Sequence, residues 1–522
     1  MTNKKIINYD WDNNEVREKR TPNSAERRYQ KTLSKNFTLY ADYKKNFNDR
    51  HDLSVMVGTS HESENYDRFT AKRINFDQQE NMSLQLGSAQ DQNAWSEGNQ
   101  WTINSFFSRV NYTFANKYVI EGTIRADGSS RFDPDHRWGW FPGVNAAWRV
   151  GEEGFMKRLG WFEDLKVRAS YGEMGNQSGI GLYDYIQLIS LSNDYYPFGA
   201  GVKGQMATSG NIISTSRTWE TIQTTNVGFD FSTLNNRLYG SFDYFWKENK
   251  NMLIPKTYPS MLGADAPSTN SGHLSIHGWE ISLGWRDQIK DFSYSVRFNI
   301  SDAKNKVVDR VGSNLIKLGN NETPTGYPLN SYFGYEFDGI IQNEQELEAY
   351  KSRFSEGGIP GDLSVGDAMY KDLDGDGKLS VLGDGKEGSG DVKYLGDKNP
   401  RYNFGFNLSM AWKGFDLSAF IQGVGRRTMF LEGESRCPMP EAWYQSAEYW
   451  YGKTWTPERT DAQYPAITLK DKRNYNYYVS TNTKFNVAYA RLKNLQFGYT
   501  IPQTLTSKAG LQKVRGYFSG ED

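Results

Sequence analysis

The residue types and spacing best suited to chemistry are three aspartates at alternate positions, Asp372, Asp374 and Asp376, followed directly by Gly377. Carboxylates two residues apart that precede a glycine form the first half of an EF-hand-type calcium loop, in which the glycine permits a sharp turn. Calcium takes oxygen ligands, which these side chains supply. The run therefore predicts a Ca²⁺ site in a loop.

The second half of the calcium pattern is incomplete. Position twelve of the loop is Gly383, where a bidentate glutamate is expected. Asp384, Glu387 or Asp391 would have to fold back to supply the missing oxygen atoms. Two interpretations stay open, a weak calcium site and a solvated Asp/Gly turn, and in both the run stiffens a loop.

Residues for covalent or acid–base catalysis are not grouped in the sequence. A hydrolase needs a nucleophile, a base and an orienting group that converge, and the chain has no G-x-S-x-G turn. Glu152/Glu153 and Asp133/Asp135 are carboxylate pairs of the type that glycosidases use, but sequence does not fix their separation. The single cysteine, Cys437, and five scattered histidines match no zinc pattern. We expect no enzyme, with an outer-membrane hydrolase as a weaker alternative.

The elements that must position these residues are strands with one apolar and one polar face. Residues 292–301 and 403–412 alternate apolar and polar side chains, as do 118–125, 227–231 and 238–246. Strand side chains flip face at every residue, and about ten residues span a tilted bilayer crossing. We expect lipid to contact Phe292, Tyr294, Val296, Phe298, Phe404, Phe406, Leu408 and Met410, and the lumen of a barrel to contact Ser293, Ser295, Arg297, Asn403 and Asn407.

Short and long connections alternate along the chain. Tight turns are expected at 46–50, 115–117, 235–237, 287–291 and 413–414. Long polar loops are expected at 61–99, 126–137, 174–215, 251–272, 304–330, 342–400 and 427–483. This is the plan of an outer-membrane β-barrel with short periplasmic turns and long extracellular loops. A soluble sandwich would also have two-faced strands, but it seldom carries so many long loops.

Composition agrees with a membrane barrel. The chain has 33 Tyr, 29 Phe, 15 Trp and 50 Gly, with a mean hydropathy of −0.74. A barrel hides its membrane signal in alternation, so a low average does not argue against a membrane. A net charge of −1 gives no footprint for nucleic acid. Aromatic side chains near strand ends suit the two interfacial girdles, and we assign Trp138, Trp140, Trp148, Tyr239 and Trp246 to them.

Both ends of the sequence are unusual for an exported barrel. The first ten residues contain no apolar core of a signal peptide, and the last residues begin a strand that stops at Asp522. About 15 to 17 strands are recognisable, fewer than the largest barrels have. We therefore expect residues 1–522 to be one β-barrel domain fragment that lacks a signal peptide, a plug and the last strands.

Several motifs, in order, resemble the SusC/RagA class of TonB-dependent outer-membrane transporters of Bacteroidetes. They are Arg125–Phe132, Arg137–Pro142, Ala147–Arg149, Leu165–Gly172, Gly175–Gln177, Thr225–Asp230, Tyr370–Gly377, Trp455–Glu458 and Arg491–Asn494. The matches run from about residue 30 to the end of the chain.

The resemblance implies an all-β transmembrane antiparallel barrel, of about 22 strands in the family, with a plug inside it. It also implies active import of glycans, oligosaccharides or peptides across the cell outer membrane. The implied partners are the TonB complex, reached through the N-terminal region, a SusD-like lipoprotein over the barrel mouth, and outer-membrane lipid. Aromatic residues of loop 427–483 would then contact that lipoprotein or stack on sugars, or only pack the loop itself. A passive porin is the alternative, because it has the same wall.

Overall fold

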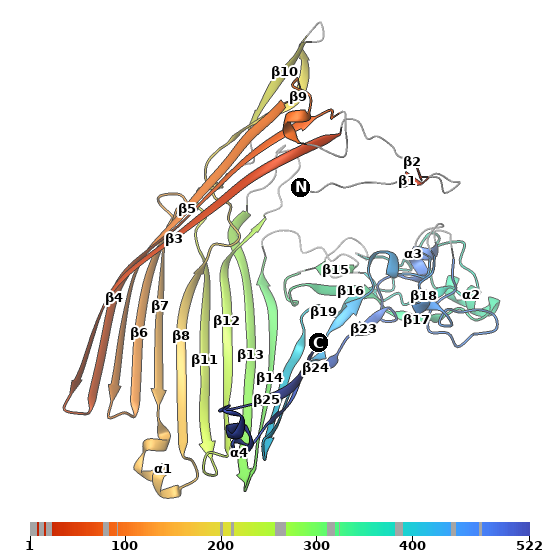
Figure 1. Ribbon diagram of the computed structural model, residues 1–522. Helices are drawn as coiled ribbons and strands as arrows, with labels where there is room; N and C mark the ends of the chain where they lie inside the picture. The colour runs from red at the N-terminus through yellow and green to blue at the C-terminus, as the bar shows by residue number, and fades with distance from the viewer. Residues whose placement is uncertain are drawn as a thin grey trace.

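The computed structural model describes residues 8–9, 15–16, 23–76, 83–90, 92–198, 202–209, 213–255, 268–310, 319–322, 324–381, 390–439, 445–468 and 472–522. Its main feature is one antiparallel sheet of 14 strands. Figure 1 shows this sheet as an open, curved wall with the tight turns at its lower end. The all-β fold is confirmed, and this sheet has fewer strands than the 15 to 17 expected from sequence.

Each wall strand pairs with the next wall strand along the chain. In chain order the strands are β3 (Ser24–Phe47), β4 (His51–Ile74), β5 (Gln92–Phe114), β6 (Tyr118–Ser129), β7 (Trp138–Trp148), β8 (Asp164–Asn176), β11 (Glu220–Thr233), β12 (Leu238–Pro255), β13 (Ser268–Ile289), β14 (Phe292–Asp309), β20 (Arg401–Trp412), β21 (Phe415–Arg426), β24 (Tyr489–Thr500) and β25 (Arg515–Glu521). The two edges of the wall are β3 and β25.

Tight turns close the lower end of the wall where the sequence predicted them. Ala115, Asn116, Asn235 and Asn236 have φ between +51° and +61° there, a left-handed conformation that asparagine tolerates better than most residues. Gly414 takes φ +93° between β20 and β21. The connection between β7 and β8 at this end is longer. It contains the 3₁₀ turn η2 (Val150–Glu152) and then a short helix, α1 (Gly154–Leu159).

The register of the ladder keeps apolar and polar faces continuous from strand to strand. Arg297 of β14 lies opposite Asn407 of β20, and Phe298 lies opposite Phe406. Large side chains on the apolar face are bare, with Trp140 at 66% exposure. A soluble sandwich would bury that face against a second sheet, so these described residues exclude it.

An aromatic row crosses the lower end of the apolar face. The rings of Phe114, Tyr118 and Trp148 lie next to one another, with centroids 6.3 Å apart at each step. Glu153 accepts hydrogen bonds from Tyr118 Oη at 2.7 Å and Trp148 Nε1 at 3.2 Å, and pairs with Lys117 at 2.9 Å. Rings with polar tips held toward a charged loop suit a membrane interface, which supports the girdle assigned to Trp148.

Tyr239 does not belong to the girdle assigned to it from sequence. It lies opposite Gly284, which in turn lies opposite Arg297, so the ring is on the polar face. The pairing register of β12 determines the face on which the Tyr239 ring lies, because a shift of one residue would move the ring to the opposite face of the sheet.

The predicted loop at 61–99 is wrong over most of its length. Residues 61–74 and 92–99 continue β4 and β5, so that β3, β4 and β5 have 24, 24 and 23 residues. Strands this long extend about 80 Å, against a bilayer core of about 30 Å. Figure 1 shows the three strands rising above the others as an arm. Above the bilayer both faces are wet, so the pattern of alternation that marks a membrane strand is not needed.

The other long connections contain secondary structure as well. The connection after β8 holds a hairpin of β9 (Ile189–Phe198) and β10 (Val202–Ser209). Those after β14 and β21 hold β15 (Gly319–Glu322), β16 (Ser331–Tyr335), β17 (Phe337–Ile340), α2 (Glu344–Lys351), β18 (Ala368–Tyr370), β19 (Val392–Asp397), β22 (Thr428–Phe430), η4 (Gly433–Ser435), η5 (Glu448–Trp450), α3 (Lys472–Asn476) and β23 (Lys484–Asn486). The remaining elements are β1 (Asn8–Tyr9), β2 (Glu15–Val16), η1 (Leu84–Leu86), α4 (Gln503–Thr506) and η6 (Ser507–Ala509).

The described parts of 319–400 and 427–486 pack into one body, which we name the loop unit. Its core contains Tyr350, Tyr370 and Tyr475, with Tyr350 Oη 2.8 Å from Tyr475 Oη. Asn476 donates to Asp367 Oδ1 at 2.8 Å and accepts from the N–H of Ala368 at 3.0 Å. Figure 1 shows the unit to the right of the wall, with its strands β19 and β23 on the side toward the wall. Two connections far apart in sequence are thus held together by buried tyrosines.

Among the described residues, no helix is long and apolar enough to cross a membrane.

Candidate functional site

The polar face of the wall carries an ion network across β8, β11 and β12. Arg168 contacts both carboxylate oxygens of Asp243 at 2.6 Å and those of Asp230 at 3.2 Å. Lys166 adds an ion pair to Asp230 at 2.9 Å. Such bidentate pairs are among the stronger hydrogen bonds in proteins. They fix three strands side by side on the face that we assign to the lumen.

Gly228 makes room for this network. It lies directly between Arg168 and Asp243 in the register of β8, β11 and β12. A Cβ at this position would lie 2.6 Å from Asp243 Oδ1 and 2.6 Å from the carbonyl oxygen of Phe242. Only glycine therefore lets the guanidinium group reach across the middle strand.

Further along the same face, two arginines flank the ring of Tyr239. The guanidinium carbon of Arg286 is 5.2 Å from the ring centroid and that of Arg297 is 5.8 Å from it. Gly284 leaves space for the ring, since a Cβ there would lie 2.3 Å from it. Cations over an aromatic ring interact favourably, and they give the wall a cationic patch.

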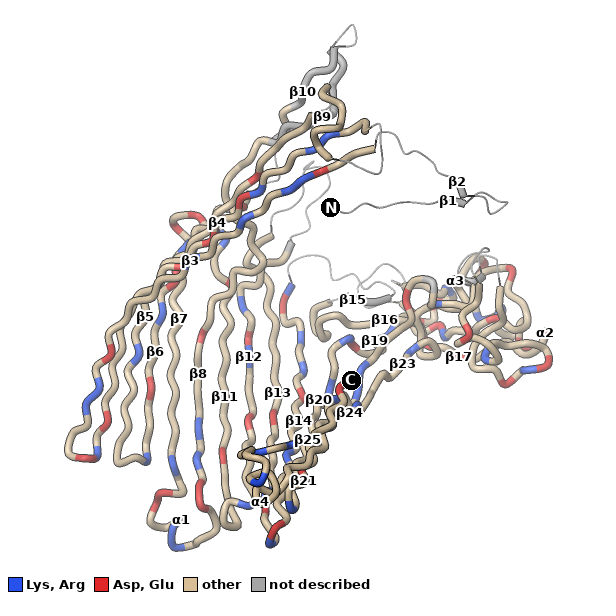
Figure 2. The backbone as a smooth tube through the Cα atoms, in the orientation of Figure 1, with Lys and Arg blue, Asp and Glu red and all other residues tan. Residues whose placement is uncertain are grey.

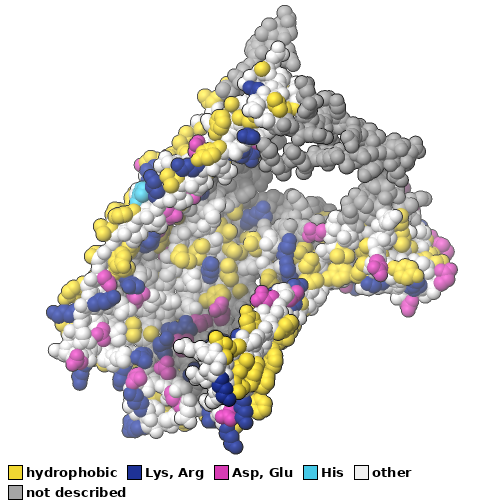
Figure 3. All heavy atoms as spheres, in the orientation of Figure 1, with side chains coloured by type: hydrophobic (Ala, Val, Ile, Leu, Met, Phe, Trp, Pro, Cys, Tyr) yellow, Lys and Arg dark blue, Asp and Glu magenta, His cyan; other side chains and the backbone are white. Residues whose placement is uncertain are grey.

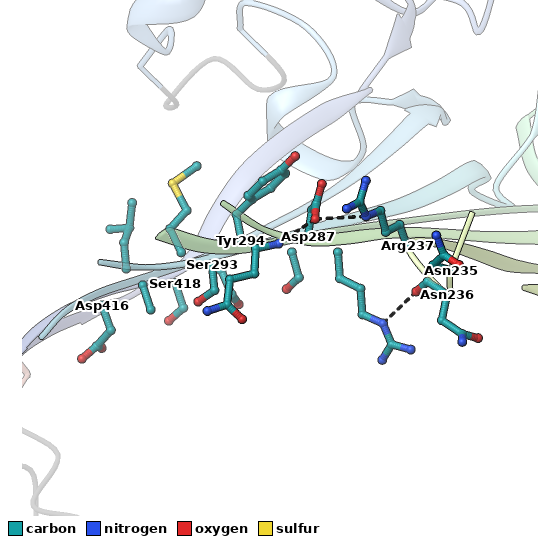
Figure 4. Close-up of a pocket in the computed structure, with 15 residues that line it drawn as sticks. Asn235, Asn236, Arg237, Asp287, Ser293, Tyr294, Asp416 and Ser418 are labelled. Atoms are coloured by element: carbon teal, nitrogen blue, oxygen red, sulfur yellow. Dashed lines mark hydrogen bonds and ion pairs between the residues drawn. The ribbon is translucent and has the colours of Figure 1, made fainter. Parts of the chain in front are cut away.

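A cavity of about 720 Å³ lies at the turn ends of β13, β14, β20 and β21. Figure 4 shows Ser293, Asp416 and Ser418 on one side of the sheet and the ion pair of Arg237 with Asp287 on the other. Hydroxyl and amide groups dominate its polar lining, and no nucleophile and base are paired there among the described residues.

Polar side chains of β6 also lie in hydrogen-bond and ion-pair networks. Glu121 accepts from Asn111 at 3.1 Å and from Asn145 at 3.2 Å. Arg125 pairs with Asp127 at 2.7 Å. Figure 3 shows Lys, Arg, Asp and Glu side chains scattered over the hollow of the wall, with apolar side chains gathered on its outer edges. A polar hollow of this kind matches the lumen of a barrel.

The predicted calcium residues lie together in the loop unit. One oxygen atom from each of Asp372, Asp374 and Asp376 falls within 4.8 Å of the others. Asp372 accepts from the N–H groups of Gly375 and Gly377 at 2.7 and 2.9 Å. The tight turn is therefore built by these carboxylates themselves, and their grouping fits both interpretations given above.

Asp391 lies beneath the aspartate turn rather than among its oxygen atoms. It is fully buried, and it accepts from the N–H groups of Leu373 at 2.6 Å and Ser380 at 2.7 Å. Burial raises the pKa of Asp391, and the charges of Asp374 and Asp372 raise it further. The other two residues that were expected to fold back, Asp384 and Glu387, lie outside the described residues, as does Gly383.

The aromatic residues of loop 427–483 mostly pack the loop unit. Trp450 is 2% exposed and Trp455 is 9% exposed, whereas Tyr451 is 89% exposed. Lys453 lies over the ring of Tyr449, with Nζ 3.6 Å from the centroid. Trp450 and Trp455 therefore pack the loop itself, which was one of the alternatives left open by the sequence.

The carboxylate pairs weighed for hydrolysis are structural. Glu152 pairs with Lys157 at 2.6 Å, and Glu153 holds the aromatic row. Asp133 accepts from the N–H of Asp135 at 3.1 Å, which closes a turn. Cys437 is buried with Trp450 and Tyr477.

Sequence reasoning missed Arg168, Asp230 and the open position at Gly228. Their alternation placed Asp230 and Gly228 on one face, but a pairing across three strands depends on register. No sequence signal marks this pair, because Gly228 lies between Arg168 and Asp243 only across the strands.

The wall of sequential antiparallel strands, its bare apolar face and its polar hollow define a β-barrel of the outer membrane. The chain belongs to a family described as TonB dependent receptor-like, beta-barrel, whose model matches residues 3–512.

Relatives and solved structures agree with the family. TonB-dependent receptor P3 of Formosa agariphila is 31% identical over 508 residues, which cover 94% of this chain and 47% of the relative. TonB-dependent receptor SusC of Bacteroides thetaiotaomicron is 26% identical over 89% of this chain and 44% of its own length. The structure of the RagAB peptide importer in a closed state matches with a TM-score of 0.76 at 23% identity, over 95% of this chain and 52% of that one. The resemblance to the SusC/RagA class is thereby confirmed, and the chain spans less than half of these two relatives.

Proposed function

We propose that this chain forms the barrel wall of an active importer of oligosaccharides or peptides in the outer membrane. Its energy would come from the TonB complex, and a SusD-like surface lipoprotein would capture the cargo. The observation that carries the proposal is the family match along nearly the whole chain, with relatives that are named TonB-dependent receptors. The polar hollow and the loop unit support it, since cargo needs a wet path and a surface partner needs a wide, rigid platform.

The test is uptake by the host with this locus deleted and then restored. We expect deletion to abolish growth on one class of oligosaccharide or peptide, and restoration to rescue it only when TonB and the neighbouring lipoprotein gene are intact. Uptake that continues without TonB would instead identify a passive porin. Cleavage of cargo by the purified protein would instead identify a hydrolase.

We further propose that the turn at Asp372, Asp374 and Asp376 binds Ca²⁺ weakly. Support comes from the close grouping of the three carboxylates. The ion would stabilise the loop unit and take no part in chemistry.

A further inference from the structure

A second cavity lies where the wall meets the loop unit, and we name it the basic cavity. It has a volume of about 380 Å³ and is lined from the loop ends of β14, β20 and β21, from segment 324–330 and from β19. Its lining includes one carboxylate, that of Asp397. It also includes five cationic side chains, those of Lys304, Lys306, Arg401, Arg426 and Arg427. Figure 2 shows Lys and Arg positions near this junction of β14, β19 and β20.

Among the described residues, Arg401 is the one cation of the five that forms an ion pair. Arg401 forms a bidentate pair with Asp302, which is 7% exposed. Asp397 is already held by Tyr394 Oη at 2.7 Å and by the N–H of Asn399 at 3.0 Å. Lys304, Lys306 and Arg426 form no ion pair there, so the cavity holds uncompensated positive charge.

The backbone register forces two of these cations together. Arg426 lies directly opposite Arg401 in the β20–β21 ladder. Like charges directly opposite each other are destabilising, and Asp302 offsets only the charge of Arg401. Arg427 follows Arg426 directly in the chain and adds a further cation to the lining of the cavity.

The surroundings are rigid and already positive. The N–H of Val307 donates to the carbonyl of Tyr327 at 2.9 Å, and the N–H of Leu329 donates to Asn305 Oδ1 at 2.6 Å, which fixes segment 324–330 against β14. Partial desolvation lowers the pKa of nearby Lys484, and the charges of Arg426 and Lys393 lower it further. A pre-formed pocket with several cations favours a multiply charged oxyanion.

We propose that the basic cavity binds a phosphate group. The cavity is larger than one phosphate, so the group would be part of a bigger molecule, either the headgroup of an outer-leaflet lipid or a phosphorylated solute. Arg426 and Arg427 would supply the charge-assisted hydrogen bonds, with Lys304 and Lys306 as further counter-charges. This inference is independent of which cargo the wall transports.

The test uses the full-length protein, purified in uncharged detergent, with inorganic phosphate as the probe. The melting temperature is measured at increasing phosphate concentrations, and at increasing chloride concentrations of the same ionic strength. We expect phosphate alone to raise the melting temperature, and the double variant Arg426→Gln/Arg427→Gln to bind it at least about tenfold more weakly, since two charge-assisted bonds are lost. Lys290→Gln/Lys508→Gln, at the opposite end of the wall, should bind as the unchanged protein does.

Equal shifts with chloride and phosphate, or an unchanged shift in the cavity variant, would overturn the proposal. Should the arginine variant fail to fold, Lys304→Gln/Lys306→Gln removes charge from the same cavity and is expected to weaken phosphate binding in the same direction. Mass spectrometry of protein taken directly from the membrane separates the two sources. If the control retains a phosphorylated lipid that the cavity variant has lost, the ligand of the cavity is a lipid headgroup. A phosphate effect without such lipid identifies a solute.

Discussion

At the scale of single residues, the wall is stabilised by side chains that reach across a neighbouring strand to form an ion pair. Arg168 reaches Asp243 over Gly228, and no neighbour in sequence would reveal that pair. The aspartate turn is the opposite case, since Asp372, Asp374 and Asp376 are recognisable from spacing alone. Local chemistry can be predicted from sequence, whereas pairing across strands requires the register.

Replacing Arg168 with Met should destabilise the wall by about 1–3 kcal/mol, because two half-buried carboxylates lose their partner. Lys166→Met is the matched control and should cost under about 1 kcal/mol, since Lys166 is 37% exposed and solvent screens its pair with Asp230. Urea unfolding in detergent micelles measures both. Equal losses in the two variants would mean that the bidentate geometry contributes nothing special.

The double variant Asp374→Asn/Asp376→Asn tests calcium at the turn. Each of these carboxylates accepts one backbone N–H through Oδ1, which an asparagine can also accept, so the turn should persist without the charge. We expect calcium affinity of about 10⁻⁴–10⁻³ M in the unchanged protein, and weaker binding with faster protease cleavage at 342–400 in the variant. Calorimetry at millimolar calcium measures the affinity. No heat, with unchanged cleavage, would identify a plain polar turn.

At the scale of elements, the wall strands and the loop unit follow different rules. Strands in the membrane need one face for lipid, so β14 and β20 were predictable from their alternation. The loop unit and the upper parts of β4 and β5 have water around them, so their sequences are free of that pattern and were predicted as loops. Their order comes from backbone ladders and from buried tyrosines, whose contacts join segments more than a hundred residues apart.

Substitution with arginine on each face of β20 tests which face contacts lipid and which faces the lumen. Phe406→Arg should block membrane assembly, at a cost of about 2–4 kcal/mol near the midplane, whereas Asn407→Arg should be tolerated. Heat-modifiable migration on gels reports assembly. If both variants assemble equally well, the assignment of the apolar face to lipid is wrong.

Tyr350→Phe tests whether the loop unit is one cooperative body. Tyr350 Oη accepts from the N–H of buried Tyr370 at 2.9 Å, so its loss leaves that donor unsatisfied at a cost of about 1–3 kcal/mol. Hydrogen exchange should quicken together in 342–381 and 472–480. Tyr451→Phe, at an exposed tyrosine, is the control and should change neither segment. Faster exchange in one segment alone would show two independent loops.

Acid should loosen the same body through Glu336, which pairs with Lys371 at 2.7 Å and also with Lys393. The two ammonium groups lower the pKa of Glu336 from 4.5 to about 2. A depressed pKa gives a contribution that is complete above pH 4.5 and is lost as the pH falls toward 2. Hydrogen exchange of β16–β19 across that range should quicken in the unchanged protein and depend less on pH in Glu336→Gln.

At the scale of the whole molecule, the wall exposes an apolar face and has β3 and β25 at its edges. The barrel class followed from the sequence because strand period, turn residues and aromatic content all point to it. The curvature, the arm of β3 to β5 and the packing of the loop unit did not, since each depends on contacts between residues far apart in the chain.

The 522-residue chain on its own should self-associate in buffer without detergent, because bare rings and unpaired strand edges attract other copies. Detergent that covers the apolar face should reduce the association. Sedimentation with and without detergent measures this. A monomer in plain buffer would contradict a lipid-facing surface.

The bidentate pair of Asp302 with Arg401 closes the long excursion between β14 and β20 at its base, so the chain leaves the wall and returns to it at neighbouring positions. Because buried contacts hold the two connections of the loop unit together, residues 310–400 and 427–488 would be exchanged as one cassette, which leaves the register of the wall strands unchanged. A chimaera that receives this cassette from a relative should keep its barrel while acquiring a new outer surface. Diversification of what the cell recognises would then proceed by replacement of whole excursions, with the wall held constant beneath them.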